Sequence, residues 1–486
     1  MPEQVTDSKS RIKSLLIRMK SLYSRTHPTP RISLFFIAVV AKLTASALSG
    51  IGFVVNSPVL LIMGTVVWLL FFAILFIIAV PATDRFLQNH MRWLKPTSLT
   101  IFFALLLIGL IEFTVVFTVG FASVDVDILG ENTSQVFTSF DNTFAYNDAT
   151  ALCHQAVINF IDGDNPYVEA NIGSALAGYD VPLDKLTPLR EGRFAEVFPY
   201  PATEQIELIA QEAVDNPQNI PPELESKLGY PAGCFLVPAP FAILGIGDLR
   251  FVYFLIILPV LVYAVWKTPP RFRIFIVAAL LISLEFWNSL AAGETGFLCF
   301  PFLLLAWILP RKRLWLPALC LGIAVAIKQV AWFFLPFYLI LIFREEGLKK
   351  ALSSLAIIAA TFLVFNAPYI IGDPGLWLTS VMSPITDNLF PLGVGIITLV
   401  TSGIVDAQSP LIFSILELVV FGLAIIWYFR YCLRYPNTGP ILAILPLFFA
   451  WRSLWPYFFY IDFIVLIAVI INEYGRRLKE QPPNLA

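Results

Sequence analysis

Stretches of about 20 mostly apolar residues recur along this chain, from Arg31 to its last thirty residues, and a helix needs that length to cross a bilayer. Of the 486 residues, 58% are hydrophobic and only 14% are charged, so a soluble core could not bury the apolar surface. The alternating strand segments that are typical of membrane barrels are not evident. The sequence therefore predicts an all-α, polytopic integral membrane protein.

We expect about twelve transmembrane helices from the apolar stretches. They cover residues 33–54, 57–80, 98–121, 250–266, 274–290, 296–309, 314–327, 330–343, 351–371, 409–429, 438–450 and 454–473. The pair at 314–327 and 330–343 is short enough to form half-depth helices that meet at an apex. The segment 232–247 is shorter still and is broken by Pro238 and Pro240, so we expect a re-entrant or surface helix.

Basic residues in the connections set the predicted orientation, because Lys and Arg gather on the cytoplasmic side. The clusters are Arg85, Arg92 and Lys95; Lys267, Arg271 and Arg273; Arg311, Lys312 and Arg313; Arg344, Lys349 and Lys350; Arg430 and Arg434; and Arg476, Arg477 and Lys479. All of them fall on one side if 232–247 does not cross the membrane. We therefore expect cytoplasmic termini, with a basic N-terminal segment at 1–32 and a tail at 476–486.

The predicted organisation divides the rest of the chain into two parts. Two N-terminal transmembrane helices lie within 33–97, and a larger membrane domain covers 98–475. This domain contains the acidic loop 122–231, whose basic residues are Lys185, Arg190, Arg193 and Lys227. The loop is large enough to fold over the non-cytoplasmic face of the membrane.

Three cations occupy positions that the orientation rule does not explain. Arg250, Lys328 and Arg452 lie at the outer ends of apolar helices, where an anionic ligand such as a lipid phosphate would account for them. Alternatively, each could extend to lipid headgroups or pair with a loop carboxylate. Further polar groups near this face are Glu294, His154 and Tyr457, for which solvation or structural hydrogen bonding is the simpler interpretation.

The five cysteines show no CxxC or CxxH spacing, so neither a disulfide framework nor a zinc site is indicated. We predict no cofactor and leave a divalent metal open. Basic residues are spread thinly over the inner loops, which gives no support to nucleic-acid binding.

Three stretches resemble polyprenol-phosphate-sugar-dependent glycosyltransferases of the GT-C superfamily. The first is YNDATALCHQAVINFIDGDNPY (146–167), which resembles the start of that family's first external loop. The second is GYPAGCFLVPAPFAILGIGDLRFVYF (229–254), and the third combines GETGFLCFPFLLLAWIL with LGIAVAIKQVAWFFLPFYLIL. The resemblance covers roughly 98–475 and is nearest to polyprenol-phosphate-mannose-dependent mannosyltransferases and related uncharacterised membrane proteins. Ala232 and Glu294 depart from the family pattern, which commonly has Pro and Gln there.

The resemblance implies transfer of a sugar, mannose or another hexose, from a polyprenyl-phosphate donor on the outer face of the membrane. The acceptor would be a lipid-linked glycan or another hydroxyl compound, and the membrane a prokaryotic cell (inner) membrane. A loop aspartate would be the general base in an inverting displacement. Asp148 aligns with the family's aspartate, Asp125 and Asp127 compete with it, and a helix cap or a solvated carboxylate is the structural alternative.

The leaving phosphate needs a cation, and the predicted positions on the outer face suggest roles for the other candidates. Arg452, Lys328 and Arg250 would bind the donor phosphate, whereas Glu294, Tyr457, His154 and Tyr167 would contact substrate. A transporter of a small or lipid-linked anionic substrate is the main alternative, although the two halves of the chain share no evident repeat. A non-enzymatic membrane scaffold would be favoured only if the outer polar groups did not converge.

Overall fold

A computed structural model describes residues 29–90, 94–115, 145–179, 181–182, 185–309 and 313–474, with single positions at 14, 17 and 118. The described chain is mostly helical, and its strands are the two-residue β1 (Leu392–Gly393) and β2 (Arg452–Ser453), which pair in parallel. This confirms the predicted helical class.

Within the described residues, six helices are long and apolar enough to cross a membrane. They are α2 (Pro30–Val54), α3 (Pro58–Ala79), α12 (Leu249–Lys267), α18 (Leu348–Gly372), α21 (Leu411–Tyr431) and the segment Trp455–Tyr474, which combines η9 (Trp455–Tyr457), α23 (Ile461–Ala468) and η10 (Val469–Tyr474). A seventh span results if the pair 270–282 and α14 (Leu284–Ala291), bent by 54°, counts as one crossing. The structure therefore supports an integral membrane protein.

The remaining predicted crossings are also helical in the described residues, and most of these helices are shorter or broken. They correspond to α5 (Leu94–Val115), α15 (Gly296–Ile308), α16 (Trp315–Ile327), α17 (Phe334–Glu346) and α22 (Gly439–Ile444) with η8 (Leu445–Phe449). Between α16 and α17 the backbone becomes extended at Lys328 and continues as η6 (Gln329–Phe333). This break lies where the sequence predicted an apex.

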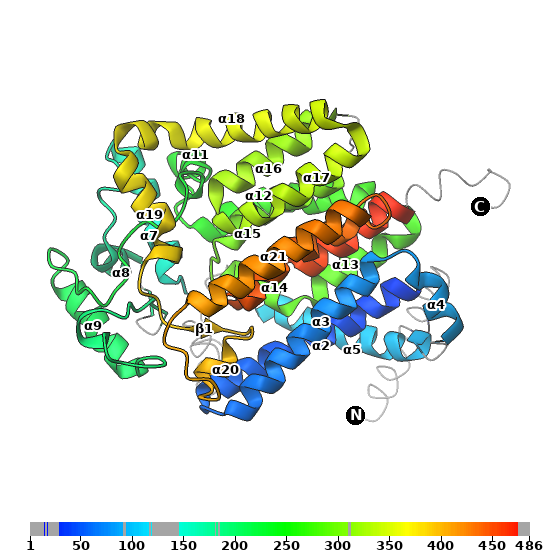
Figure 1. Cartoon of the computed structure of the whole chain (residues 1–486), viewed down its shortest axis with the longest axis horizontal. Helices are drawn as coiled ribbons and strands as arrows, with labels where there is room; N and C mark the ends of the chain where they lie inside the picture. The colour runs from blue at the N-terminus through cyan, green and yellow to red at the C-terminus, as the bar shows by residue number, and fades with distance from the viewer. Residues whose placement is uncertain are drawn as a thin grey trace, which may run out of the picture.

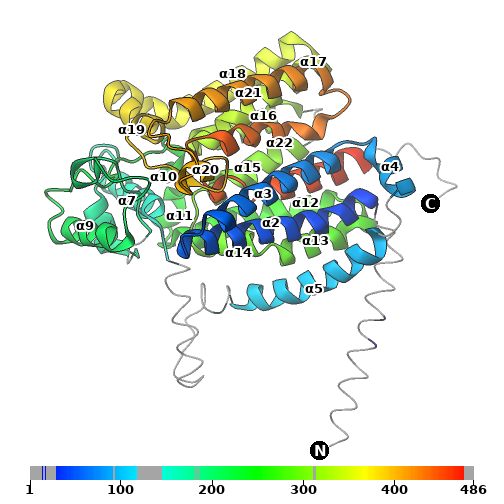
Figure 2. The same ribbon diagram turned by 60° about the horizontal axis from the view of Figure 1, so that its bottom comes forward.

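The long helices lie roughly alongside one another, and the two ends of the bundle differ (Figures 1 and 2). At one end lie α7 (Asp148–Asp162), α8 (Ile172–Tyr179), α9 (Thr203–Asp215) and α19 (Pro374–Thr386), together with α20 (Thr398–Thr401) and β1. The short helix α4 (Thr83–His90) lies at the opposite end. The described part of the predicted outer loop is thus gathered at one end of the bundle.

The predicted re-entrant segment forms two short helices, α10 (Gly233–Leu236) and α11 (Ala239–Ile243). They contact α7, and α10 also contacts α16 and α18. The Ala232 N–H donates to the Asn366 Oδ1 atom at 2.8 Å, which ties the start of this segment to α18. A short, broken helix that packs against protein agrees with the sequence-based expectation.

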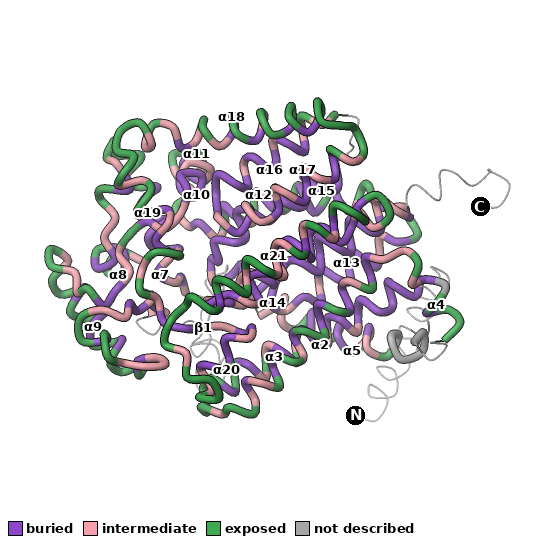
Figure 3. Tube along the Cα trace, in the orientation of Figure 1, coloured by how far each residue is buried: buried purple, intermediate pink, exposed green. Residues whose placement is uncertain are grey.

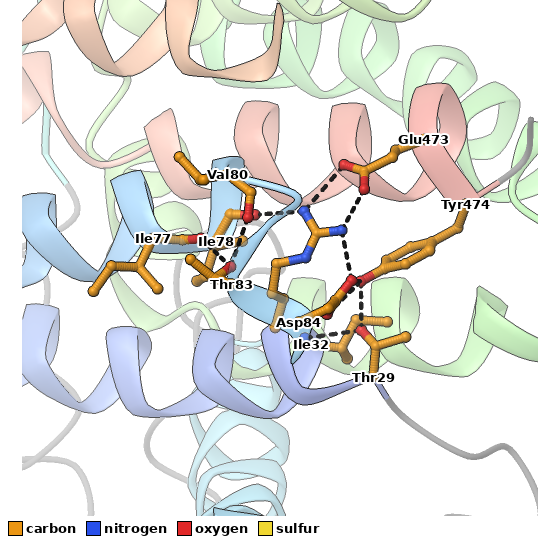
Figure 4. Close-up of polar contacts among 10 residues, drawn as sticks. Thr29, Ile32, Ile77, Ile78, Val80, Thr83, Asp84, Glu473 and Tyr474 are labelled. Atoms are coloured by element: carbon orange, nitrogen blue, oxygen red, sulfur yellow. Dashed lines mark hydrogen bonds and ion pairs between the residues drawn. The ribbon is translucent and has the colours of Figure 1, made fainter. Parts of the chain in front are cut away.

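A buried arginine joins the N-terminal helices to the last helical segment. Its partners Asp84 and Glu473, with Tyr474 beside them, are labelled in Figure 4. The Arg31 side chain is fully buried, and its guanidinium donates to Glu473 at 2.5 and 3.0 Å and to Asp84 at 2.9 Å. The Tyr474 hydroxyl donates to the Asp84 carboxylate at 3.1 Å. Arg31, Asp84 and Glu473 come from α2, α4 and η10, so their contacts hold these three elements together at this end of the bundle.

A second buried ion-pair cluster lies farther along α2. The Lys42 Nζ atom lies 2.8 Å from Asp462 Oδ2 and 3.5 Å from Glu285 Oε2, and it donates to the Phe459 carbonyl at 3.1 Å. Ser46 donates a hydrogen bond to Glu285. Because Glu285 lies in the first turn of α14 and Asp462 in the first turn of α23, this cluster holds both helices against α2.

Candidate functional site

Asp148 is the first residue of α7, and its carboxylate is held by backbone donors. The Ala149 N–H donates to Oδ1 and the Thr187 N–H to Oδ2, both at 2.6 Å. The helix cap is the preceding Asn147, whose side chain accepts from the Thr150 N–H, so Asp148 does not serve as the cap. Burial raises the pKa of Asp148, and the two N–H donors oppose that shift.

Arg452 supplies a positive charge to the same region. It lies in β2, which is held against β1 by the Val394 N–H donating to the Ser453 carbonyl at 2.8 Å. Its guanidinium is within electrostatic range of Asp148. Among the described residues its side chain has no hydrogen bond or ion pair, and Nη1 is buried. A guanidinium with a buried nitrogen that lacks a partner among the described residues is suited to binding an anionic ligand.

Glu294 lies within electrostatic range of Asp148, and Lys328 lies within range of Glu294. Glu294 follows Gly293, whose positive φ of 69° makes the turn between α14 and α15, and its Oε1 accepts from the Asn147 amide at 3.2 Å. The Lys328 ammonium donates to the Thr295 hydroxyl at 2.5 Å and is within electrostatic range of Glu294. Burial raises the pKa of Glu294, while Lys328 opposes that shift.

Tyrosines from three segments surround these charges. Tyr457 is within electrostatic range of Arg452 and Glu294, and Tyr200 within range of Arg452 and Asp148. Lys328 lies 5.3 Å from the centre of the Tyr230 ring, a cation–π contact. Tyr200 and Tyr230 were not among the sequence candidates. Tyr230 falls within the second family-like stretch, whereas no sequence pattern distinguishes Tyr200.

Arg250 and His154 belong to a neighbouring polar group. Arg250 is paired with Asp248, with Nη2 and Oδ2 2.5 Å apart, and Asp248 also accepts from the Tyr146 hydroxyl at 2.9 Å. His154 stacks on Tyr179, their ring centres 4.2 Å apart, and burial lowers its pKa to about 4. The pairing of Arg250 favours a role in joining α7 to α12 over phosphate binding.

The two remaining sets of candidates have different outcomes. Tyr167 is buried, and its hydroxyl donates to the Tyr230 carbonyl at 2.9 Å, so it fixes the position of the Tyr230 backbone. Asp125 and Asp127 lie outside the described residues. The candidate site is therefore formed by Asp148, Glu294, Lys328, Arg452 and Tyr457, together with Tyr200 and Tyr230.

An ion pair joins the outer segment, residues 187–231, to the end of α19, and a second carboxyl group lies beside it. Lys227 binds both oxygens of Asp387, at 2.6 and 2.8 Å, and burial together with the adjacent Asp387 raises the pKa of Glu225 to about 8. Because the folded form favours protonated Glu225, its stabilising contribution is complete below the ordinary value of 4.5 and disappears as the pH rises through about 8.

We therefore expect the outer segment to loosen as the pH rises from about 5 to about 8. Limited proteolysis of residues 187–231 as a function of pH measures this directly. Glu225→Gln should remove the pH dependence, since glutamine cannot ionise, whereas the exposed Glu207→Gln should retain it. Equal pH dependence in wild type and Glu225→Gln would contradict this assignment.

Residues 228–439 match the family model described as Glycosyltransferase family 87. No curated protein and no solved structure matches the chain. The matched range contains Glu294 and Lys328, whereas Asp148 and Arg452 lie outside it. The family match and the membrane-crossing helices together identify a membrane glycosyltransferase, which confirms the enzyme class predicted from the sequence.

Proposed function

We propose that this enzyme transfers a hexose, with mannose as the first candidate, from a polyprenyl-phosphate donor to a lipid-linked glycan or another acceptor. The reaction would occur on the outer face of a prokaryotic cell membrane. The observation that carries the proposal is the buried carboxylate of Asp148 within electrostatic range of the unpaired Arg452 guanidinium. A base for the acceptor and a cation for the leaving phosphate are the two groups that the reaction needs.

The proposed step is a single displacement. The acceptor hydroxyl gives its proton to the Asp148 carboxylate while its oxygen forms a bond to the anomeric carbon. The bond from that carbon to the phosphate oxygen breaks, and the polyprenyl phosphate leaves with the electron pair. Arg452 stabilises the charge that develops on the phosphate. Attack from the face opposite the phosphate inverts the anomeric centre.

The other site residues would orient the substrates. Glu294 can accept hydrogen bonds from sugar hydroxyls, and Tyr457 presents a hydroxyl on the same side. Lys328, already bonded to Thr295, adds positive charge near the donor phosphate. Donor, acceptor and bilayer are the only partners that the proposal requires.

The proposal includes the finer topology predicted from the sequence. Twelve segments would cross or enter the membrane, with 122–231 outside, 232–247 re-entrant and both termini cytoplasmic. The gathering of α7, α8 and α9 at one end of the bundle supports this arrangement (Figure 1). The segments 1–32, 33–97, 98–475 and 476–486 would be the units of the chain.

Sugar transfer by Arg452 variants tests the proposal. Wild-type protein in liposomes should transfer radiolabel from polyprenyl-phosphate mannose or another polyprenyl-phosphate hexose. Arg452→Met should lower kcat/KM for the donor by about 100- to 1,000-fold, because an oxyanion would lose its cation. Arg452→Lys should lose less, since one ammonium keeps the charge without the guanidinium's fork of donors.

Arg434→Met is the matched control, because Arg434 is an exposed arginine three residues after the last residue of α21. Its activity should equal that of the wild type. Folded wild-type protein that transferred no sugar from any polyprenyl-phosphate donor would contradict the proposed donor class. Full activity in Arg452→Met would remove Arg452 from the site.

A further inference from the structure

Glu417 is an acidic residue in the middle of a lipid-facing helix. It lies in α21, the sequence of which contains no other acidic residue, and most large apolar side chains of α21 are exposed (Figure 3). The residue lies six positions after Leu411, or about 9 Å along the helix axis from the end nearest the site. A carboxyl group at this depth is costly in a bilayer, so its presence points to a function.

Helix periodicity shows which way Glu417 faces. Phe413 precedes it by four residues and therefore lies on the same side of α21. The Phe413 ring packs against Trp451, with ring centres 5.5 Å apart, and Trp451 is the neighbour of Arg452. Tyr457 is within electrostatic range of both Glu417 and Arg452. Glu417 therefore faces the Arg452–Tyr457 segment from the membrane side.

Both side chains have unused hydrogen-bonding capacity. Among the described residues, Glu417 makes no hydrogen bond or ion pair, and the same holds for the Arg452 side chain, with its buried Nη1. A carboxylate repels a phosphate but accepts hydrogen bonds from hydroxyl groups. A ligand with a phosphate beside a ring of hydroxyls would satisfy both residues together.

We propose that Glu417 is a substrate-binding residue on the bilayer side of the site, where it accepts hydrogen bonds from the sugar of a lipid-linked donor. The donor reaches Arg452 laterally, past α21, and its isoprenoid chain remains in the lipid. This inference rests on the proposed function, because it assigns a contact to the same donor. It adds a residue and a direction of entry that neither the sequence motifs nor the family match indicates.

Steady-state kinetics of Glu417 variants in liposomes test the contact. Glu417→Leu should raise the donor KM by about 10- to 100-fold, as expected for loss of hydrogen bonds to a charged group, with kcat changed less than about threefold. Glu417→Gln should fall between wild type and Leu, since its amide oxygen still accepts. Ser414→Leu, at an exposed position one turn away, is the control and should leave KM unchanged.

A merely structural role would change a different quantity. The donor KM is therefore measured for a set of donors that each lack one sugar hydroxyl. Removal of one of these hydroxyls should weaken donor binding to the wild type but should not weaken binding to Glu417→Leu any further. A Glu417→Leu variant with unchanged donor KM, or with a higher acceptor KM alone, would overturn the inference.

Photo-crosslinking separates this inference from the proposed function. A polyprenyl-phosphate hexose that carries a diazirine on the sugar should label the peptide containing residues 411–431 in wild type, and less so in Glu417→Leu. If wild-type protein transfers no sugar, the proposed function fails, yet the label on α21 still decides whether this surface binds the lipid-linked sugar. Absence of label on α21 in an otherwise labelled protein would contradict the inference.

Discussion

Asp148→Asn is expected to lower kcat for sugar transfer by about 100- to 10,000-fold, with the donor KM changed little. The amide has nearly the shape of the carboxylate but cannot take the proton from the acceptor hydroxyl. Its oxygen can still accept from one of the two N–H groups that hold Asp148, so α7 should begin at the same residue. The expected loss therefore concerns chemistry and not folding.

Transfer of radiolabelled hexose by wild type and Asp148→Asn, at matched expression and matched thermal stability, measures this loss. Asp162→Asn is the control, because Asp162 is an exposed residue at the other end of α7. Transfer that survives Asp148→Asn would reassign the base, with Asp125 and Asp127 as the next candidates. Equal losses in both variants would indicate a general defect of α7.

The helices could be predicted from the sequence because membrane insertion leaves a local signal. A continuous apolar stretch such as 58–79 must be buried in lipid or protein. The predicted crossing 57–80 therefore matches α3 to within two residues at each end. The breaks were harder to predict. No proline or glycine marks the 54° bend at Ser283, which divides a segment that the sequence presents as one crossing.

The candidate site was predicted in part. Asp148 and Arg452 were chosen separately, and only the fold shows that they are close enough to interact. Arg250 was expected to bind phosphate, but its charge is balanced by Asp248, two residues earlier in the sequence. Tyr200 and Glu417 were missed because each is a single residue without a motif, and its role depends on contacts with distant segments.

The ion pairs inside the bundle were missed for the same reason. Lys42, Glu285 and Asp462 are each separated from the next by more than 170 positions in the sequence. Each appears as an isolated charge in an apolar stretch. No local pattern indicates which opposite charge will be its partner. The first predicted crossing is consequently tied to the helices that lead to Glu294 and away from Arg452, which the division of the chain at residue 97 does not suggest.

Lys42→Met should therefore be among the most destabilising single substitutions in this protein. The ammonium is fully buried and lies 2.8 Å from Asp462, so its removal leaves uncompensated carboxylates inside the bundle. Breaking a buried pair in this way costs about 3–5 kcal/mol, which is a large part of the stability of most proteins. We expect a much lower melting temperature in detergent and poor accumulation in membranes.

The triple variant Lys42→Met, Asp462→Asn, Glu285→Gln provides the decisive comparison. Neutralising the whole cluster removes the unpaired charge, so this variant should recover most of the stability lost by Lys42→Met. Thermal unfolding in detergent, monitored by size-exclusion chromatography, measures both, with the exposed Lys350→Met as the control. If the triple variant were no more stable than Lys42→Met, the loss would come from the lysine's packing against Phe71 and the Phe459 carbonyl, and not from charge. If Lys42→Met unfolded at the wild-type temperature, the cluster would contribute nothing to holding α14 and α23 against α2.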